Sequence, residues 1–385
     1  MSFLRSERIA AVLLLAAAAL ALVLANSPLG DALVRLRDVD LGPADLGLRL
    51  SAGHWVTDGI LAIFFFVAAI ELRSELSVGE LNTRRKAFVP LIAALGGVVA
   101  PALIFVAITT GTDQVRGWPI PTATDIAFAL GILALVGRGL PPRVRALLLA
   151  LAIIDDLIAI TLIAVLFTDG MQPLALLGAV PVVLLFGYLA RRRVTGGSRA
   201  AMVAVMVVLV CLTWYLVYTS GVHATIAGVA LGLVMPVDGG SALKHRLEPW
   251  TNGLVLPLFA FTASLVLLPR DGAANLEPVF WGIVVALPVG KLVGITIATL
   301  LATRLVPKAQ RMGAIPLGDI LVVATLGGVG FTVALLMNDL AFRGDEGVVA
   351  QGTIAVLAGS AISIVAGLVV TSIRARRYRK LESTR

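Results

Sequence analysis

The sequence predicts an all-α polytopic membrane protein that forms one integral membrane domain over residues 1–385. Hydrophobic residues make up 59% of the chain and charged residues only 14%, whereas soluble domains carry about 25% charged residues. The mean hydropathy is +0.98. The formal net charge of +8 does not indicate a nucleic-acid partner, because the basic residues occur in short loops rather than on one face. The expected surroundings are therefore a lipid bilayer.

Twelve apolar segments are the second observation behind this prediction. They cover residues 9–25, 55–72, 87–110, 122–137, 146–167, 174–190, 201–219, 223–236, 251–268, 278–303, 319–342 and 348–373. The first follows two arginines, as a signal peptide does, but its apolar core exceeds the roughly 7–15 residues typical of one. We therefore interpret it as the first membrane span.

The distribution of basic residues predicts the orientation of the spans. With the N-terminus inside, the inner segments hold 24 Lys and Arg and the outer loops hold 6. Basic residues favour the cytoplasmic side, so this split predicts that both termini are cytoplasmic and that the number of spans is even.

The longest predicted outer loop, residues 31–53, has a pattern typical of a small β-hairpin. Leu46, Leu48 and Leu50 alternate with Gly47 and Arg49, and Gly42-Pro43 provides a turn. An irregular loop fits the same residues. A hairpin with an exposed edge would favour pairing with a second copy of the chain.

Two predicted spans are interrupted. The fourth is short and follows Pro119 and Pro121, and the eleventh contains Gly327, Gly328 and Gly330. Short or glycine-interrupted spans in separate halves of a transporter indicate broken helices at a central ion site. Small residues also allow close helix packing, so the glycines alone leave both interpretations open.

Few charged residues lie deep inside the predicted spans. They are Asp125 at the start of the fourth, Asp155 and Asp156 in the fifth, and Lys291 in the tenth. Unpaired, the four would cost on the order of 10 kcal/mol to insert. They must therefore share partners or water, and intramembrane carboxylates indicate an ion-binding or proton-handling site.

Helix geometry separates the two adjacent aspartates. Neighbouring residues on a helix point about 100° apart, so Asp155 and Asp156 cannot face one partner. One of them can pair with Lys291, and the other is free to join Asp125 around a small ion. Clustered carboxylates cannot all ionise cheaply, so such a site holds either protons or a cation. Carboxylates, the Thr124 hydroxyl and unwound backbone are hard oxygen ligands suited to Na⁺ or Li⁺.

Glu71 and Glu75 lie one turn apart at the inner end of the second span. Solvated helix-end charges are one interpretation, and an acidic entrance that gathers cations or responds to pH is the other.

Six motifs together resemble the NhaA-type sodium/proton antiporters over nearly the whole chain. They read PTATDIAFALGILAL, LALAIIDDLIAI, SGVHATIAG, LPLFAFTAS, ALPVGKLVGI and GGVGFT. The resemblance implies twelve helices in inverted repeats, with the two broken helices crossing at mid-membrane. It also implies electrogenic export of Na⁺ and Li⁺ against entering protons across the bacterial cell membrane, without a cofactor.

The resemblance also implies roles for individual residues. Asp156 corresponds to the main ion and proton carboxylate, Asp155 to the partner of Lys291, and Asp125 with Thr124 to the lining of the crossing. Glu71 and Glu75, with Glu248 at the inner end of the ninth span, correspond to the cytoplasmic entrance and its pH response. The 31–53 loop corresponds to a dimerisation hairpin.

The sequence around the entrance departs from the family pattern. It reads Lys244-His245-Arg246-Leu247-Glu248-Pro249, with fewer His and Glu than usual, and Ser74 stands where a basic residue is frequent. The pH profile is therefore not predicted. Two alternatives remain, a sodium-coupled solute symporter and an intramembrane aspartyl protease. The protease lacks its usual Gly-x-Gly-Asp context and leaves Lys291 without a role.

Overall fold

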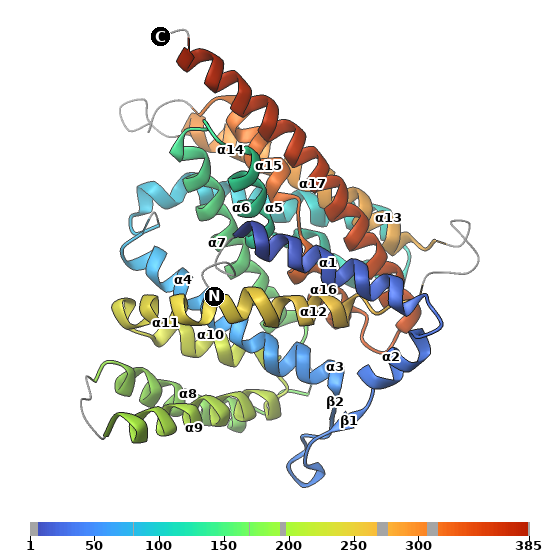
Figure 1. Ribbon diagram of the computed structural model, residues 1–385, viewed down its shortest axis with the longest axis vertical. Helices are drawn as coiled ribbons and strands as arrows, with labels where there is room; N and C mark the ends of the chain where they lie inside the picture. The colour runs from blue at the N-terminus through green and yellow to red at the C-terminus, as the bar shows by residue number, and fades with distance from the viewer. Residues whose placement is uncertain are drawn as a thin grey trace.

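The computed structural model describes residues 7–79, 81–168, 170–192, 198–267, 276–305 and 315–383, which are almost entirely helical (Figure 1). The helices are α1 (Glu7–Ala25), α2 (Gly30–Arg37), α3 (Ala52–His54), α4 (Leu61–Ser77), α5 (Arg84–Thr109), α6 (Ile126–Val136), α7 (Pro142–Leu166), α8 (Pro173–Ala190), α9 (Ser198–Thr219), α10 (Thr225–Val234), α11 (Val237–Trp250), α12 (Leu256–Ala263), α13 (Pro278–Val285), α14 (Lys291–Leu305), α15 (Leu317–Gly327), α16 (Phe331–Ala341) and α17 (Glu346–Ser383). Three π-helical segments, η3 (Trp55–Ile60), η6 (Thr251–Val255) and η8 (Ala286–Gly290), continue directly into α4, α12 and α14.

Each of the twelve predicted spans coincides with a helix or with consecutive helices. Among the described residues, seven helices are long and apolar enough to cross a membrane, or up to ten if each bent pair is one span. The predicted spans 223–236 and 251–268 correspond to α10 and to η6 with α12, which are shorter. Residue 268 lies outside the described residues. The all-α polytopic fold is confirmed.

The same order of elements occurs twice along the chain. A long helix, a broken span and a further helix follow one another as α5, α6 and α7, and again as α13–α14, α15–α16 and α17. The first helices of the two sets, α5 and α14, pack closely, because a Cβ at Gly96 would collide with Gly294 and one at Gly294 with Gly96. This arrangement agrees with inverted repeats and brings the two broken spans together.

The 31–53 loop, which the sequence predicts to be the first outer one, contains both a helix and a hairpin. α2 occupies its start, and β1 (Asp40–Leu41) pairs antiparallel with β2 (Leu50–Ser51). The strands are shorter than the leucine alternation predicts, because the chain turns at Gly42 and Gly47, which have φ of 110° and 67°. The tip contacts α9, where the hydroxyls of Tyr215 and Tyr218 each donate to a loop carbonyl.

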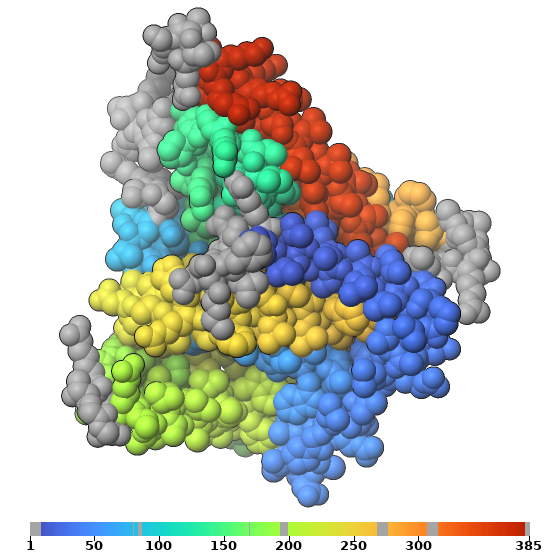
Figure 2. All heavy atoms as spheres, in the orientation of Figure 1, coloured from blue at the N-terminus to red at the C-terminus, as the bar shows by residue number. Residues whose placement is uncertain are grey.

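The helices differ in how far they are enclosed by others. α8 and α9 form a pair at the edge of the molecule (Figure 1). An apolar stretch of 18 residues in α9 is only 17% buried inside the molecule, whereas the corresponding stretch of α7 is 56% buried. Figure 2 shows α11, η6 and α12 crossing the visible face between α1 and the α8–α9 pair. α7 therefore lies inside the bundle, where its two central aspartates are surrounded by protein.

Candidate functional site

The breaks in the two interrupted spans lie against each other. The backbone N–H of Asp125 donates to Val329 O at 2.6 Å, and the Thr124 hydroxyl donates to Gly327 O at 2.8 Å. The helices on the two sides of each break are bent by 41° and 46°. Residues far apart in the sequence therefore satisfy each other's free backbone groups, which is what non-helical backbone inside a membrane protein requires.

Local sequence explains each break. Pro119 and Pro121 lack N–H groups, so the chain forms a short 3-10 helix, η5 (Ile120–Thr122), before α6 begins at Ile126. In the eleventh span, Gly327 ends α15, Gly328 is its C-cap and Gly330 is the N-cap of α16. None of these glycines has positive φ. Their missing side chains instead allow close approach, since a Cβ at Gly330 would lie 2.7 Å from Leu287 Cδ1 and 3.0 Å from Ala123 O. The two interpretations of these glycines, helix break and close packing, therefore apply together.

The Asp125 carboxylate joins the N-termini of two half-helices. Its Oδ1 accepts from the Phe128 N–H at 3.1 Å, which caps α6. Its Oδ2 accepts from the N–H and the hydroxyl of Thr332, in the first turn of α16, at 3.2 and 2.7 Å. Helix N-termini carry partial positive charge, so one buried carboxylate is stabilised by both.

Asp155 and Asp156 have different surroundings on α7. Lys291 Nζ, at the start of α14, lies 2.8 Å from Asp155 Oδ2, and the side chains are 0% and 1% exposed. The other oxygen of Asp155 is buried and has no hydrogen-bond partner in the described parts of the chain. Asp156 is less enclosed and lines a cavity that Asp155 does not reach.

This cavity of about 150 Å³ connects the crossing with the acidic end of α4. Thr124, Asp125, Asp156 and Thr332 line it at the crossing. Its other charged lining residues are Glu71 of α4 and Lys244 and Glu248 of α11. A smaller cavity of about 20 Å³ also lies between Glu71 and Asp156. The structure thus brings five of the predicted site residues, Glu71, Thr124, Asp125, Asp156 and Glu248, around one cavity, whereas Asp155, Lys291, Glu75 and the three glycines do not line it.

Glu71 of α4 and Lys244 of α11 form an ion pair that the sequence did not indicate. Lys244 Nζ lies 2.9 Å from Glu71 Oε1, and both side chains are about one quarter exposed. Glu248 Oε2 lies 3.6 Å from Nδ1 of His245, an exposed residue one turn earlier on the same helix. Glu75, one turn beyond Glu71, does not line either cavity.

Two further buried acids belong to polar networks that the sequence did not indicate. Asp58 Oδ1 lies 3.1 Å from His223 Nε2, and the Trp214 N–H donates to the Asp58 carbonyl. Asp319, at the start of α15, is 1% exposed and binds two arginines. Both lie within predicted spans, near their ends rather than at their centres.

In the described residues, no group of three or more His, Cys, Asp or Glu side chains could hold a metal ion. A cation in the cavity would need the carboxylate of Asp156 together with other oxygens. The oxygens available are the hydroxyls of Thr124 and Thr332 and the backbone carbonyls of the two breaks. The two hydroxyls donate their protons to Gly327 O and Asp125 Oδ2, and each keeps lone pairs that could bind a cation.

The family model described as Na⁺/H⁺ antiporter 1 matches residues 1–371. The Na⁺/H⁺ antiporter NhaA 2 of Clavibacter michiganensis is 53% identical over 381 residues, which is 98% of this chain and 93% of that protein. NhaA 2 of Rhodococcus jostii is 45% identical over 388 residues, 98% of this chain and 92% of that protein. NhaA of Tropheryma whipplei is 41% identical over 388 residues, covering 100% and 99%.

Proposed function

The chain belongs to the Na⁺/H⁺ antiporter 1 family, and from this premise we propose that it is a secondary antiporter of the bacterial membrane, which exports Na⁺ in exchange for entering protons. The observation that carries the proposal is the passage from Glu71 to the crossing, with Asp156 as the carboxylate of α7 that faces it. The family is one of transporters rather than enzymes, so we expect neither covalent chemistry nor a cofactor.

Asp156 is the residue to which we assign exchange. Its carboxylate can hold either a proton or a cation, and a cation would draw further oxygens from Thr124, Thr332 and the unwound backbone. Because both cargoes need the same ionised carboxylate, binding of one releases the other, and the two fluxes are coupled without a separate energy source. Li⁺ is a hard cation of the same charge, so we include it as cargo.

Asp155 and Lys291 have a different role in this proposal. Their 2.8 Å contact neutralises two charges beside the exchange site and fixes α7 against α14. Lys291 can also release its proton when the Asp155 carboxylate becomes neutral, because the ion pair between them is then lost. An exchange of more than one proton for each cation would make transport electrogenic.

The passage supports a conformation that is open to the cytoplasm. The excess of basic residues in the inner loops favours cytoplasmic termini, and on that orientation Glu71, Lys244 and Glu248 face the cytoplasm. Glu71, Glu75 and Glu248 would then attract cations to the mouth and adjust the response to pH. Reaching the other side requires that the crossing and Asp156 become exposed outward in turn.

We further propose that the protein forms a homodimer through the 31–53 loop. β1 is a two-residue strand, both residues of which are exposed, and such an edge is available to a second copy. Deletion of residues 40–51 should yield monomers when the mass of the protein is measured in detergent. Persistent dimers would contradict this interface.

The alternatives find less support at the site. An aspartyl protease needs two aspartates sharing one water, but Asp125 accepts hydrogen bonds from two half-helices and Asp155 pairs with Lys291. A symporter needs space for an organic solute, and the cavity of about 150 Å³ is below the roughly 300–1,000 Å³ of small-molecule pockets.

Reconstituted vesicles test the proposed function. The protein is placed in liposomes with an internal pH dye, and Na⁺, Li⁺ or K⁺ is added outside at acidic, neutral and alkaline pH. We expect Na⁺ and Li⁺ to drive proton movement, and Asp156→Asn to abolish it. Asp113→Asn, at an exposed position of the 3-10 helix η4 (Asp113–Gly117), is the matched control and should transport normally. Absence of cation-driven proton movement at every pH would refute the antiporter, and normal exchange by Asp156→Asn would refute its assigned residue.

A further inference from the structure

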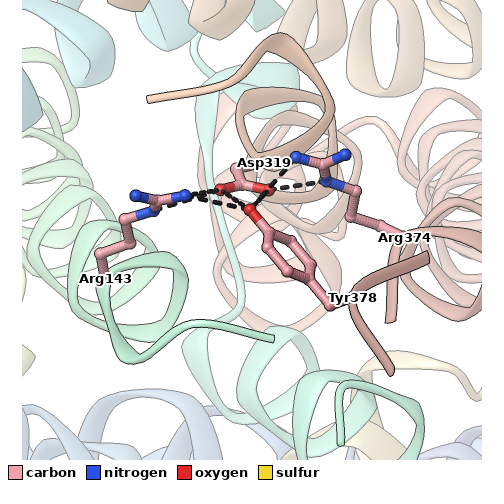
Figure 3. A network of polar contacts seen from close by, with 4 residues as sticks. All are labelled: Arg143, Asp319, Arg374 and Tyr378. Atoms are coloured by element: carbon pink, nitrogen blue, oxygen red, sulfur yellow. Dashed lines mark hydrogen bonds and ion pairs between the residues drawn. The ribbon is translucent and has the colours of Figure 1, made fainter. Parts of the chain in front are cut away.

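A buried carboxylate at the start of α15 binds side chains from two other helices (Figure 3). Arg374 Nε donates to Asp319 Oδ1 at 2.7 Å, and Arg143 Nη2 donates to Asp319 Oδ2 at 3.0 Å. The Tyr378 hydroxyl lies 3.1 and 3.0 Å from the two oxygens. Arg143 belongs to α7, whereas Arg374 and Tyr378 belong to α17. We refer to these four residues as the clamp.

The clamp is a connected network rather than three separate pairs. The Tyr378 hydroxyl accepts from Arg143 at 3.0 Å and from Arg374 at 3.2 Å. The Arg374 guanidinium also lies over the Tyr378 ring, 4.6 Å from its centroid. Gly318 leaves room for this arrangement, because a Cβ there would lie 2.9 Å from Arg374 Nε. Charge, hydrogen bonding and shape therefore converge on one carboxylate.

α15 is thus fastened at both ends. Asp319 holds its N-terminal end, and eight residues later, about 12 Å along the helix, Gly327 O accepts from Thr124. The half-helix is rigid between these points. Any displacement of its clamped end would consequently reach the crossing, where Val329 O and Gly327 O hold the fourth span.

α7 is fastened by the same clamp. Arg143 lies in its first turn, and Asp155 and Asp156 follow about 18 Å further along. α15 packs against both α7 and α17. The clamp therefore fixes the half-helix that forms one side of the crossing relative to the helix that carries the exchange carboxylates.

We propose that Asp319 is a positioning residue for ion exchange. It holds α15 in the position relative to α7 at which Thr124, Asp125 and Asp156 face one cavity. This inference rests on the proposed exchange function. Asp319 does not line the cavity, so it acts only through the helices that it joins. Its loss leaves two guanidinium groups facing each other and releases the end of α15.

The Na⁺ dependence of exchange in vesicles tests the inference. Asp319→Asn should raise the apparent KM for Na⁺ by about tenfold, and Asp319→Glu should recover most of the affinity. Leu209→Ala, a cavity-forming change at a buried position of α9, is the control for lost stability and should lower the Tm without changing KM. An unchanged KM in Asp319→Asn would overturn the inference, whatever its Tm.

Two additions keep the test decisive. Gly318→Ala would place its Cβ 2.9 Å from Arg374 Nε and should raise the KM by about threefold, so it replaces Asp319→Asn if that variant does not fold. Hydrogen exchange of residues 317–327 should increase in Asp319→Asn but not in Leu209→Ala, a result that does not depend on transport. Unaltered protection of this segment would also overturn the inference. A wild-type protein that shows no exchange would instead contradict the proposed function.

Discussion

Thr332 donates both its backbone N–H and its hydroxyl to Oδ2 of Asp125, so the first turn of α16 binds the residue that caps α6. The two half-helices that begin at the crossing therefore share one carboxylate. This relationship holds the fourth and eleventh spans together at the proposed exchange site, and it fixes one wall of the cavity that Asp156 lines.

Removal of the Thr332 hydroxyl should weaken this joint. Thr332→Val keeps the volume and the backbone N–H but loses the 2.7 Å bond to a carboxylate, which corresponds to about 1.5–3 kcal/mol of unfolding free energy. Thr332→Ser retains the hydroxyl and is the matched control. Thermal unfolding in detergent should place the valine variant clearly below the serine variant. Equal Tm values would show that the hydroxyl does not contribute.

The buried ion pair predicts an asymmetric response to mutation. Lys291→Ala leaves the Asp155 carboxylate enclosed without its partner, which should cost about 3–5 kcal/mol. The double variant Lys291→Met with Asp155→Asn removes both charges and should recover most of the Tm. A double variant as unstable as Lys291→Ala would argue that packing of the lysine stem, rather than charge pairing, stabilises the fold.

The pair at the entrance should matter more for cation entry than for stability. Lys244 and Glu71 are partly exposed, so their contact contributes no more than about 1 kcal/mol. Lys244→Gln removes a positive charge from the passage, and we expect a lower apparent KM for Na⁺ with little change in Tm. The difference from wild type should shrink at high concentrations of an untransported salt such as choline chloride, because salt screens exposed charges. A raised KM would contradict this role.

Local features of the sequence were sufficient for most of the fold. Span positions follow from hydropathy, and the two breaks follow from Pro119, Pro121 and the glycines of the eleventh span. The separation of Asp155 from Asp156 follows from helix geometry alone. These features are all contained within one segment of chain, and so a sequence pattern reveals them.

Apart from the pairing of Lys291 with one of the two adjacent aspartates, contacts between distant segments were not accessible in this way. Asp319 meets Arg143 across 176 residues, and Thr124 meets Gly327 across 203. Lys244 reaches Glu71 only because α11 packs against α4. Such pairs depend on how helices pack in three dimensions, whereas each residue alone has the pattern of an ordinary helix-end charge or a loop hydroxyl.

Gly330 provides a test of how tightly the crossing is packed. In Gly330→Ala the new Cβ would lie 2.7 Å from Leu287 Cδ1 and 3.0 Å from the Ala123 carbonyl oxygen, so the Leu287 side chain must move and the fourth span must shift by a few tenths of an ångström. We expect a loss of about 1–3 kcal/mol in unfolding free energy, and slower Na⁺-driven proton movement in vesicles. Gly178→Ala is the matched control, because its Cβ would lie 3.9 Å from Leu216, within a helix where alanine is favoured. That variant should be at least as stable as wild type and should transport normally. If Gly330→Ala behaves like Gly178→Ala, the crossing can open to admit a methyl group, and close contact at Gly330 is not what holds the two spans in place.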